Sequence, residues 1–152
     1  MFPFLRRLTP WSIVLSAVAC GAELAEPPTG FAFAAGTPDC GPADGPAVSI
    51  YLAGSPVEAL EPTTPYARVY VWHAASELEG REWALAGATS EGSAQFVATT
   101  GDFEAATAGT LTVVAVRADH TIEGEVDLTF PTVGRVRGGF TAIWLPRTVM
   151  CG

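Results

Sequence analysis

The last third of the sequence alternates apolar and polar residues with a period of two. The alternation runs through three segments, 111–116, 125–130 and 136–144, of which the last carries a glycine pair at 138–139. Successive side chains of a β-strand point to opposite faces, so this period is typical of strands with one buried face. The connections, 118–121 and 131–134, have the length of hairpin loops. This part of the chain is therefore predicted to be an antiparallel meander.

Earlier segments also favour strands over helices. The stretches 47–52, 67–72, 83–86 and 94–99 are short and rich in β-branched and aromatic residues, and turn residues separate them. A single helical turn is expected at 74–78, where Gly80 ends it. The expected fold class is all-β: a single antiparallel β-sandwich or small barrel with a C-terminal meander.

The C-terminal strands resemble those of a group of known proteins. The segments Gly109-Thr110-Leu111-Thr112-Val113, Gly124-Glu125-Val126-Asp127-Leu128-Thr129-Phe130 and Gly138-Gly139-Phe140-Thr141-Ala142 are similar to the ends of many uncharacterised bacterial lipoproteins. Those domains close with a cysteine just past the last strand, whereas Cys151 lies somewhat further on here. The likeness covers about a third of the chain. It implies a β domain on a lipid anchor and transfers no active site.

The first twenty residues have the pattern of an export signal. Arg6 and Arg7 precede an apolar run whose length fits a signal, and which falls short of the roughly 20 residues that cross a membrane. The run ends at Leu15-Ser16-Ala17-Val18-Ala19-Cys20, which resembles the lipobox, where bacterial lipoproteins are cut before a cysteine that is acylated, for example with palmitate. Ala17 stands where Leu is usual, and Ala17-Val18-Ala19 also suits an ordinary signal peptidase. We expect a signal peptide at 1–19 and a lipid on Cys20; a passive cysteine in a discarded signal is the alternative.

The three cysteines support this division of the chain. If Cys20 carries a lipid, Cys40 and Cys151 remain, one at each end of the folded region, as for one disulfide in an oxidising compartment. Closing so long a loop contributes on the order of 4–5 kcal/mol in the chain-entropy model; two free thiols are the alternative. The expected organisation is a signal at 1–19, a Pro-rich tether at 20–39 and a β domain at 40–152 closed by the Cys40–Cys151 disulfide.

Charge limits the partners that the chain can have. The sequence has no Lys and, without the signal, six Arg against 16 acidic residues, a formal charge of −10. Nucleic-acid phosphates and anionic lipid headgroups would repel such a surface, so no nucleic acid is expected as a partner and membrane attachment is expected through the N-terminal lipid. The sequence also has no Asn and so no N-glycosylation acceptor, which together with the lipobox predicts the bacterial cell envelope. The outer membrane is expected because Gly21 stands where Asp would indicate inner-membrane retention; a secreted or periplasmic protein is the alternative.

No catalytic motif is recognisable in the sequence. His73 and His120 are the histidines, the first beside a strand end and the second in a turn. The nearest approach to a G-x-S-x-G serine site is around Ser90, in a strand–turn–strand setting that does not suit a nucleophile elbow. No C-x-x-C pair or calcium loop occurs, so neither a metal nor a cofactor is expected.

Three aromatic residues are the candidates for a binding surface. Tyr70 and Trp72 lie on the strand face opposite Val69 and Val71, and Tyr51 is placed in the same way on its own strand. If the aliphatic face is the inner one, these rings are exposed and can bind a partner; if both faces of a central strand are covered, they are part of the packing. The leading hypothesis is a non-catalytic structural or partner-binding module. The alternatives are a small-ligand-binding β-barrel and a secreted hydrolase.

Overall fold

The computed structural model describes residues 31–58 and 62–151, and this part of the chain is all-β. The strands are β1 (Phe33–Cys40), β2 (Pro46–Ala53), β3 (Tyr66–Val71), β4 (Arg81–Ala84), β5 (Gly92–Thr99), β6 (Asp102–Ala105), β7 (Ala108–Val116), β8 (Ile122–Phe130) and β9 (Gly134–Trp144). One 3₁₀ turn, Ala75–Glu77, precedes β4, where a helical turn was predicted. The predicted fold class is confirmed.

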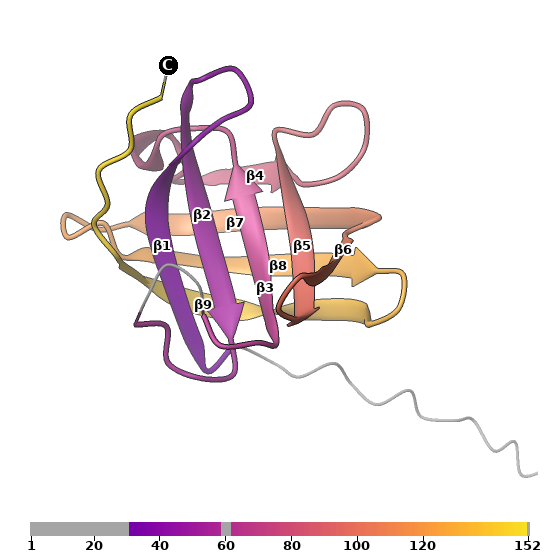
Figure 1. The fold of residues 1–152 in the computed structure, drawn as a ribbon. Coiled ribbons are helices and arrows are strands. Elements are labelled where there is room, and N and C mark those ends of the chain that lie inside the picture. The colour runs from indigo at the N-terminus through magenta and orange to yellow at the C-terminus, as the bar shows by residue number, and fades with distance from the viewer. Residues whose placement is uncertain (1–30, 59–61, 152) are drawn as a thin grey trace, which may run out of the picture.

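The strands form one curled sheet, a half-barrel, in the order β4-β7-β8-β9-β1-β2-β3-β5-β6. Its two halves face each other as layers. Strands β1, β2, β3 and β5 run steeply across β7, β8 and β9, which lie behind them (Figure 1). We call the half made by β1, β2, β3, β5 and β6 the N-terminal layer. The half made by β4, β7, β8 and β9 is the C-terminal layer.

The two layers are joined where the first strand lies beside the last. β1 pairs with β2 antiparallel over its whole length, and with β9 in parallel over Ala34–Gly36. This parallel ladder makes the sheet mixed, whereas an antiparallel sheet was predicted. The predicted tether is also too long, because residues 33–39 belong to β1. Residues 20–30 of the predicted tether and the predicted signal at 1–19 lie outside the described residues.

The main core fills the space between the layers. Its largest fully buried side chains include Trp83 from β4, Ile50 from β2 and Phe130 from β8. In the C-terminal layer the alternation in the sequence explains which side chains enter the core. The inward-pointing, almost fully buried ones include Leu111, Val113, Val126 and Leu128. β2 differs, since all of it after its first residue is buried, so both of its faces are covered.

The predicted strands correspond to seven of the observed ones, and two strands were missed. β1 reads Phe-Ala-Ala-Gly-Thr-Pro-Asp-Cys and β6 has four residues. Neither has the β-branched content on which the prediction depended. The segments 83–86 and 94–99 follow one another in the sequence but do not pair with each other. β4 pairs with β7 and β5 with β3, so the turn between them carries the chain from one layer to the other.

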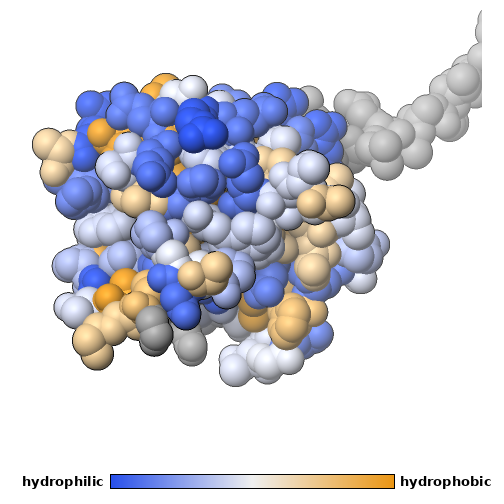
Figure 2. Space-filling model, turned by 90° about the horizontal axis from the view of Figure 1, so that it is seen from above, coloured by the Kyte–Doolittle hydropathy of each residue, from blue (hydrophilic) through white to orange (hydrophobic). Residues whose placement is uncertain are grey.

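The end of the molecule that carries the C-terminus is uneven in hydropathy. Seen from above, hydrophilic residues cover one side of it and apolar residues gather along the other (Figure 2). Among the described residues there is no helix that is long and apolar enough to cross a membrane.

Two positions on β7, one with its side chain in the core and one with its side chain in solvent, test the arrangement of the layers. Leu111 is 0% exposed in the main core, and Val114, on the outer surface, is 63% exposed. We expect Leu111→Ala to lower the free energy of unfolding by about 2–5 kcal/mol because it leaves a cavity. The control Val114→Ala should change it by no more than about 0.5 kcal/mol. Urea unfolding with an unchanged m-value measures both; a similar loss in the two variants would contradict the layer arrangement.

Candidate functional site

A polar cluster lies on the outer face of the N-terminal layer. The register places Asp39, Ser49 and Arg68 on this face of β1, β2 and β3 respectively. Ser49 Oγ donates to Asp39 Oδ2 at 2.8 Å, and Arg68 Nη2 reaches the same carboxylate oxygen at 2.8 Å. Arg68 also donates from Nε to Ser49 Oγ at 3.1 Å. We call these residues, with Tyr51 and Tyr70, the Asp39–Arg68 cluster.

Two tyrosines flank the guanidinium of this cluster. The Arg68 Cζ atom lies 5.8 Å from the ring centroid of Tyr51 and 5.3 Å from that of Tyr70, both within the range of cation–π attraction. The Tyr70 hydroxyl donates to the carbonyl oxygen of Cys40. Burial raises the pKa of the Tyr51 phenol. It also raises the pKa of the Tyr70 phenol, which is less deeply buried. Both rings are therefore neutral contact surfaces at neutral pH.

The Asp39 carboxylate is held in its charged form. Burial by itself would raise its pKa, but the hydrogen bonds from Ser49 and from the Cys40 amide, together with nearby positive charges, outweigh that effect. The positive charges of Arg68 and Arg147 act in the same direction. The pKa of Asp39 is consequently below its ordinary value, and the ion pair with Arg68 persists at neutral pH.

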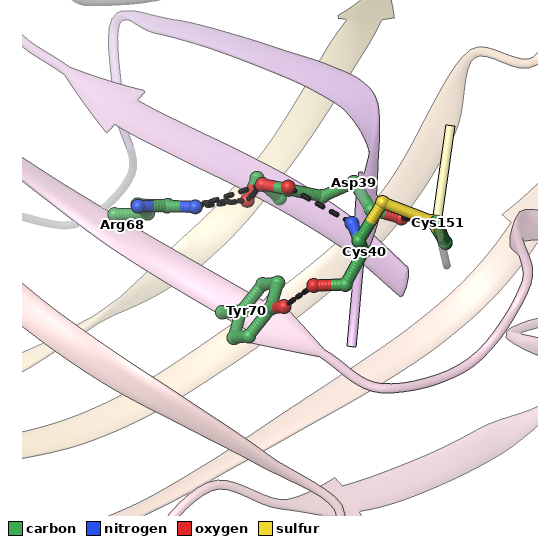
Figure 3. Close-up of a disulfide and its surroundings, with 6 residues drawn as sticks. Asp39, Cys40, Arg68, Tyr70 and Cys151 are labelled. Atoms are coloured by element: carbon green, nitrogen blue, oxygen red, sulfur yellow. Dashed lines mark hydrogen bonds and ion pairs between the residues drawn. A yellow bond between two sulfur atoms is a disulfide. The ribbon is translucent and has the colours of Figure 1, made fainter. Parts of the chain in front are cut away.

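The disulfide lies directly beside this cluster. Cys40 follows Asp39 in β1 and is bonded to Cys151, 111 positions later in the chain. Figure 3 shows Asp39 next to Cys40, with Arg68 and Tyr70 reaching the same corner of the sheet from β3. The predicted pairing of Cys40 with Cys151 is present in the structure. Cys20, the predicted lipidation site, lies outside the described residues.

The three predicted aromatic residues have different surroundings. Tyr51 and Tyr70 come together around Arg68, and Tyr51 is only 6% exposed, so for this ring the packing alternative holds. It packs edge-on against Tyr66, with ring centroids 5.9 Å apart. Tyr70 and Trp72 are half-buried. The Trp72 Nε1 atom is covered and has no hydrogen-bond partner among the described residues.

Sequence reasoning missed Asp39, Ser49 and Arg68. Asp39 was assigned to the tether, so its pairing across β2 was not considered. One signal was available: Arg68 is the charged residue within the strand 67–72 and shares its face with Tyr70. A charge on such a strand requires a partner if that face is covered.

The two histidines are not arranged for hydrolysis. His73 Nδ1 lies 3.3 Å from a Glu77 carboxylate oxygen, and His73 Nε2 lies 3.4 Å from one of Glu91. Both ring nitrogens thus face carboxylates, which leaves neither directed at a serine hydroxyl. His120 occupies a left-handed position in the turn after β7, with φ of 63°, and its ring lies 5.4 Å from that of Trp144.

The outer face of the C-terminal layer is a solvated, charged surface. Asp127 pairs with Arg135, and Arg117 pairs with Glu123, in exposed ion pairs that are worth little in water. An open hollow lies over Gly139, between Glu125 and Phe31. No group of three or more metal-ligating side chains occurs in 31–58 and 62–151.

The interior offers no support for the ligand-binding barrel. Such a protein needs a closed barrel around a pocket larger than one side chain. The sheet instead ends at β4 and β6, and the packed side chains of the main core occupy the space between its layers.

Comparison of this chain with protein-family models, with curated proteins and with solved structures gives no match.

The Asp39 carboxylate gives the fold a predictable dependence on pH. Because the pKa of Asp39 is lowered in the folded state, its contribution to the stability of the fold is complete above the ordinary aspartate pKa of about 4. That contribution is lost as the pH falls further. Asp39→Asn should lower the free energy of unfolding by about 1–3 kcal/mol at pH 7 and by clearly less at pH 3. The control is Asp102→Asn, at the exposed start of β6. Urea unfolding at both pH values measures the difference, and an equal loss at both would contradict the assignment.

Proposed function

We propose that this chain is an exported protein held at a bacterial membrane surface, at the outer membrane, by a lipid on Cys20. In this proposal its β domain acts by binding a partner and not by catalysis. The observation that carries the proposal is the pairing of the cysteines. The disulfide joins Cys40 to Cys151, so Cys20 is the odd cysteine at the end of a signal-like segment. A lipid on Cys20 explains an odd cysteine in an exported chain.

The charge of the molecule supports a lipid as the means of attachment. At a formal charge of −10 after removal of the signal, the protein would be repelled by anionic headgroups. Stable anchoring takes more than one hydrophobic chain, which a diacylglycerol on the cysteine, with a further acyl group, supplies.

The non-catalytic role is supported by how the reactive side chains are engaged. His73 faces two carboxylates, and the Asp39 carboxylate is bound by Ser49 and Arg68. A general base has to be free to take a proton from a substrate. Tyr70, whose ring lies against Arg68, and Trp72 are half-buried aromatic residues, the kind that contributes most to protein interfaces.

The anchor is tested by mass spectrometry of the full chain expressed in a bacterium. The N-terminal peptide of the membrane-bound protein should begin at Cys20 and carry diacylglycerol, and Cys20→Ser should leave the membrane fraction. A mature protein with an unmodified Cys20 thiol would disprove the anchor.

The binding role is tested by photocrosslinking of the anchored protein in cells. A benzoylphenylalanine in place of Trp72 should give adducts with a defined partner protein. The control places the same residue at Glu125, on the outer face of the other layer, and should not give those adducts. Identical adducts at both positions, or none from position 72, would contradict a binding surface at Tyr70 and Trp72.

A further inference from the structure

The segment that follows β9 is fixed at two points only among the described residues. At its start, the Leu145 amide donates to the carbonyl oxygen of Gly36 in β1 at 2.8 Å. Pro146 and, on β1, Pro38 have no amide hydrogen, so the parallel ladder cannot continue past this bond. The second fixed point is Cys151, bonded to Cys40. We call residues 145–151 the strap.

Between these two points the strap is held by few interactions. None of the backbone hydrogen bonds found in the described part of the chain involves residues 146–150. Most of its residues are exposed, and Met150 is 94% exposed. Figure 1 shows the strap passing beside β1 toward the C-terminus. Local opening is easiest for segments with few hydrogen bonds and few buried contacts.

The surface near the strap is a small apolar cluster on the outer face of the N-terminal layer. It consists of Ala35, Tyr51, Ala53 and Val57, with Tyr66 and Leu145 packed against it. Ala35 and Thr37 are both fully buried although they point outward from β1. The Thr37 Oγ1 atom has no hydrogen-bond partner among the described residues, which is unfavourable for a permanently closed surface.

The strap is independent of the main core. No residue of 145–151 belongs to the main core or is packed against it; Trp144, the last residue of β9, is the nearest that is. Removing the strap would therefore leave the contacts between the two layers in place. Its opening would expose the outer cluster alone.

We propose that the Cys40–Cys151 disulfide is a redox latch that holds the strap closed over the outer face of β1, and that a dithiol reductant opens it. The thiolate of the dithiol attacks the exposed Cys151 sulfur, forms a mixed disulfide and displaces Cys40 as a thiolate. The second thiol of the reductant then releases Cys151. The dithiol becomes a disulfide by giving up two electrons, and its two protons pass to Cys40 and Cys151. The proposal concerns the β domain and stands whether or not Cys20 carries a lipid.

Opening would change the surface next to Tyr70 and Trp72. Arg147 leaves with the strap, which removes one of the positive charges that act on Asp39 and Tyr51. Leu145 withdraws from the outer cluster, so the apolar side chains of that cluster become accessible. The state of the disulfide thus sets how much apolar surface this face presents.

Amide hydrogen exchange on the full mature chain tests the latch, with dithiothreitol as the reductant. On reduction, exchange of the Leu145 amide should become at least tenfold faster through a local opening that low urea does not affect, while the β8 amides should still exchange only through global unfolding. Cys151→Ser should show the same selective change without reductant. Reoxidation of the wild-type protein should restore slow exchange at Leu145.

Each other outcome overturns the proposal. If Leu145 exchanges at the same rate after reduction, the strap is held by its own packing. If Leu145 after reduction exchanges only together with the β8 amides, through global unfolding, the disulfide stabilises the whole domain and is not a latch. If dithiothreitol does not reduce the bond in the folded protein, the bond is a permanent crosslink.

Discussion

The three-residue ladder between β1 and β9 is the interaction on which the rest of this fold depends. The free edges of the sheet, β4 and β6, come from the middle of the chain, whereas the first and last strands lie at its centre. The two layers are continuous through β1 because it pairs on both sides. Forming that junction requires contacts between positions more than a hundred residues apart, which is entropically costly for an open chain. The disulfide closes the loop at the same corner.

The composition of β1 follows from its place at this junction. A strand with neighbours on both sides and covered faces has little room for side chains. A Cβ atom added at Gly36 would lie 3.2 Å from Ile122 and 3.3 Å from Trp144, which belong to the other layer. Ala34 and Ala35, before it, are buried on opposite faces. Small residues let the sheet turn here, and the same smallness makes the segment resemble a tether in the sequence.

The difference between what could and could not be predicted has this physical basis. Strands β7, β8 and β9 face solvent on one side, so their alternation is visible in the sequence, and their hairpin order was predicted correctly. β1 carries no such signal, because burial on both faces and close packing replace alternation by small residues. The Asp39–Arg68 pair could not be found for the same reason: it joins a strand that was missed to one that was predicted. Tyr51 and Tyr70 were placed on the correct face, but their burial depends on Arg68 and Tyr66, which sequence period does not reveal.

The outer faces of the two layers differ in how far they are covered, and therefore in the roles that they can have. On the C-terminal layer, exposed ion pairs and threonines are in contact with water, and a change there would have little effect on the fold. On the N-terminal layer, the outer sheet face is covered by an ion pair, three tyrosines and the strap. In a two-layer sandwich the outer face of each sheet is usually open to solvent. Covering that face brings a carboxylate, a guanidinium and a reducible bond together at one corner. Because the main core fills the space between the layers, the proposed binding role falls to a surface, and this corner combines aromatic contact area with the proposed latch.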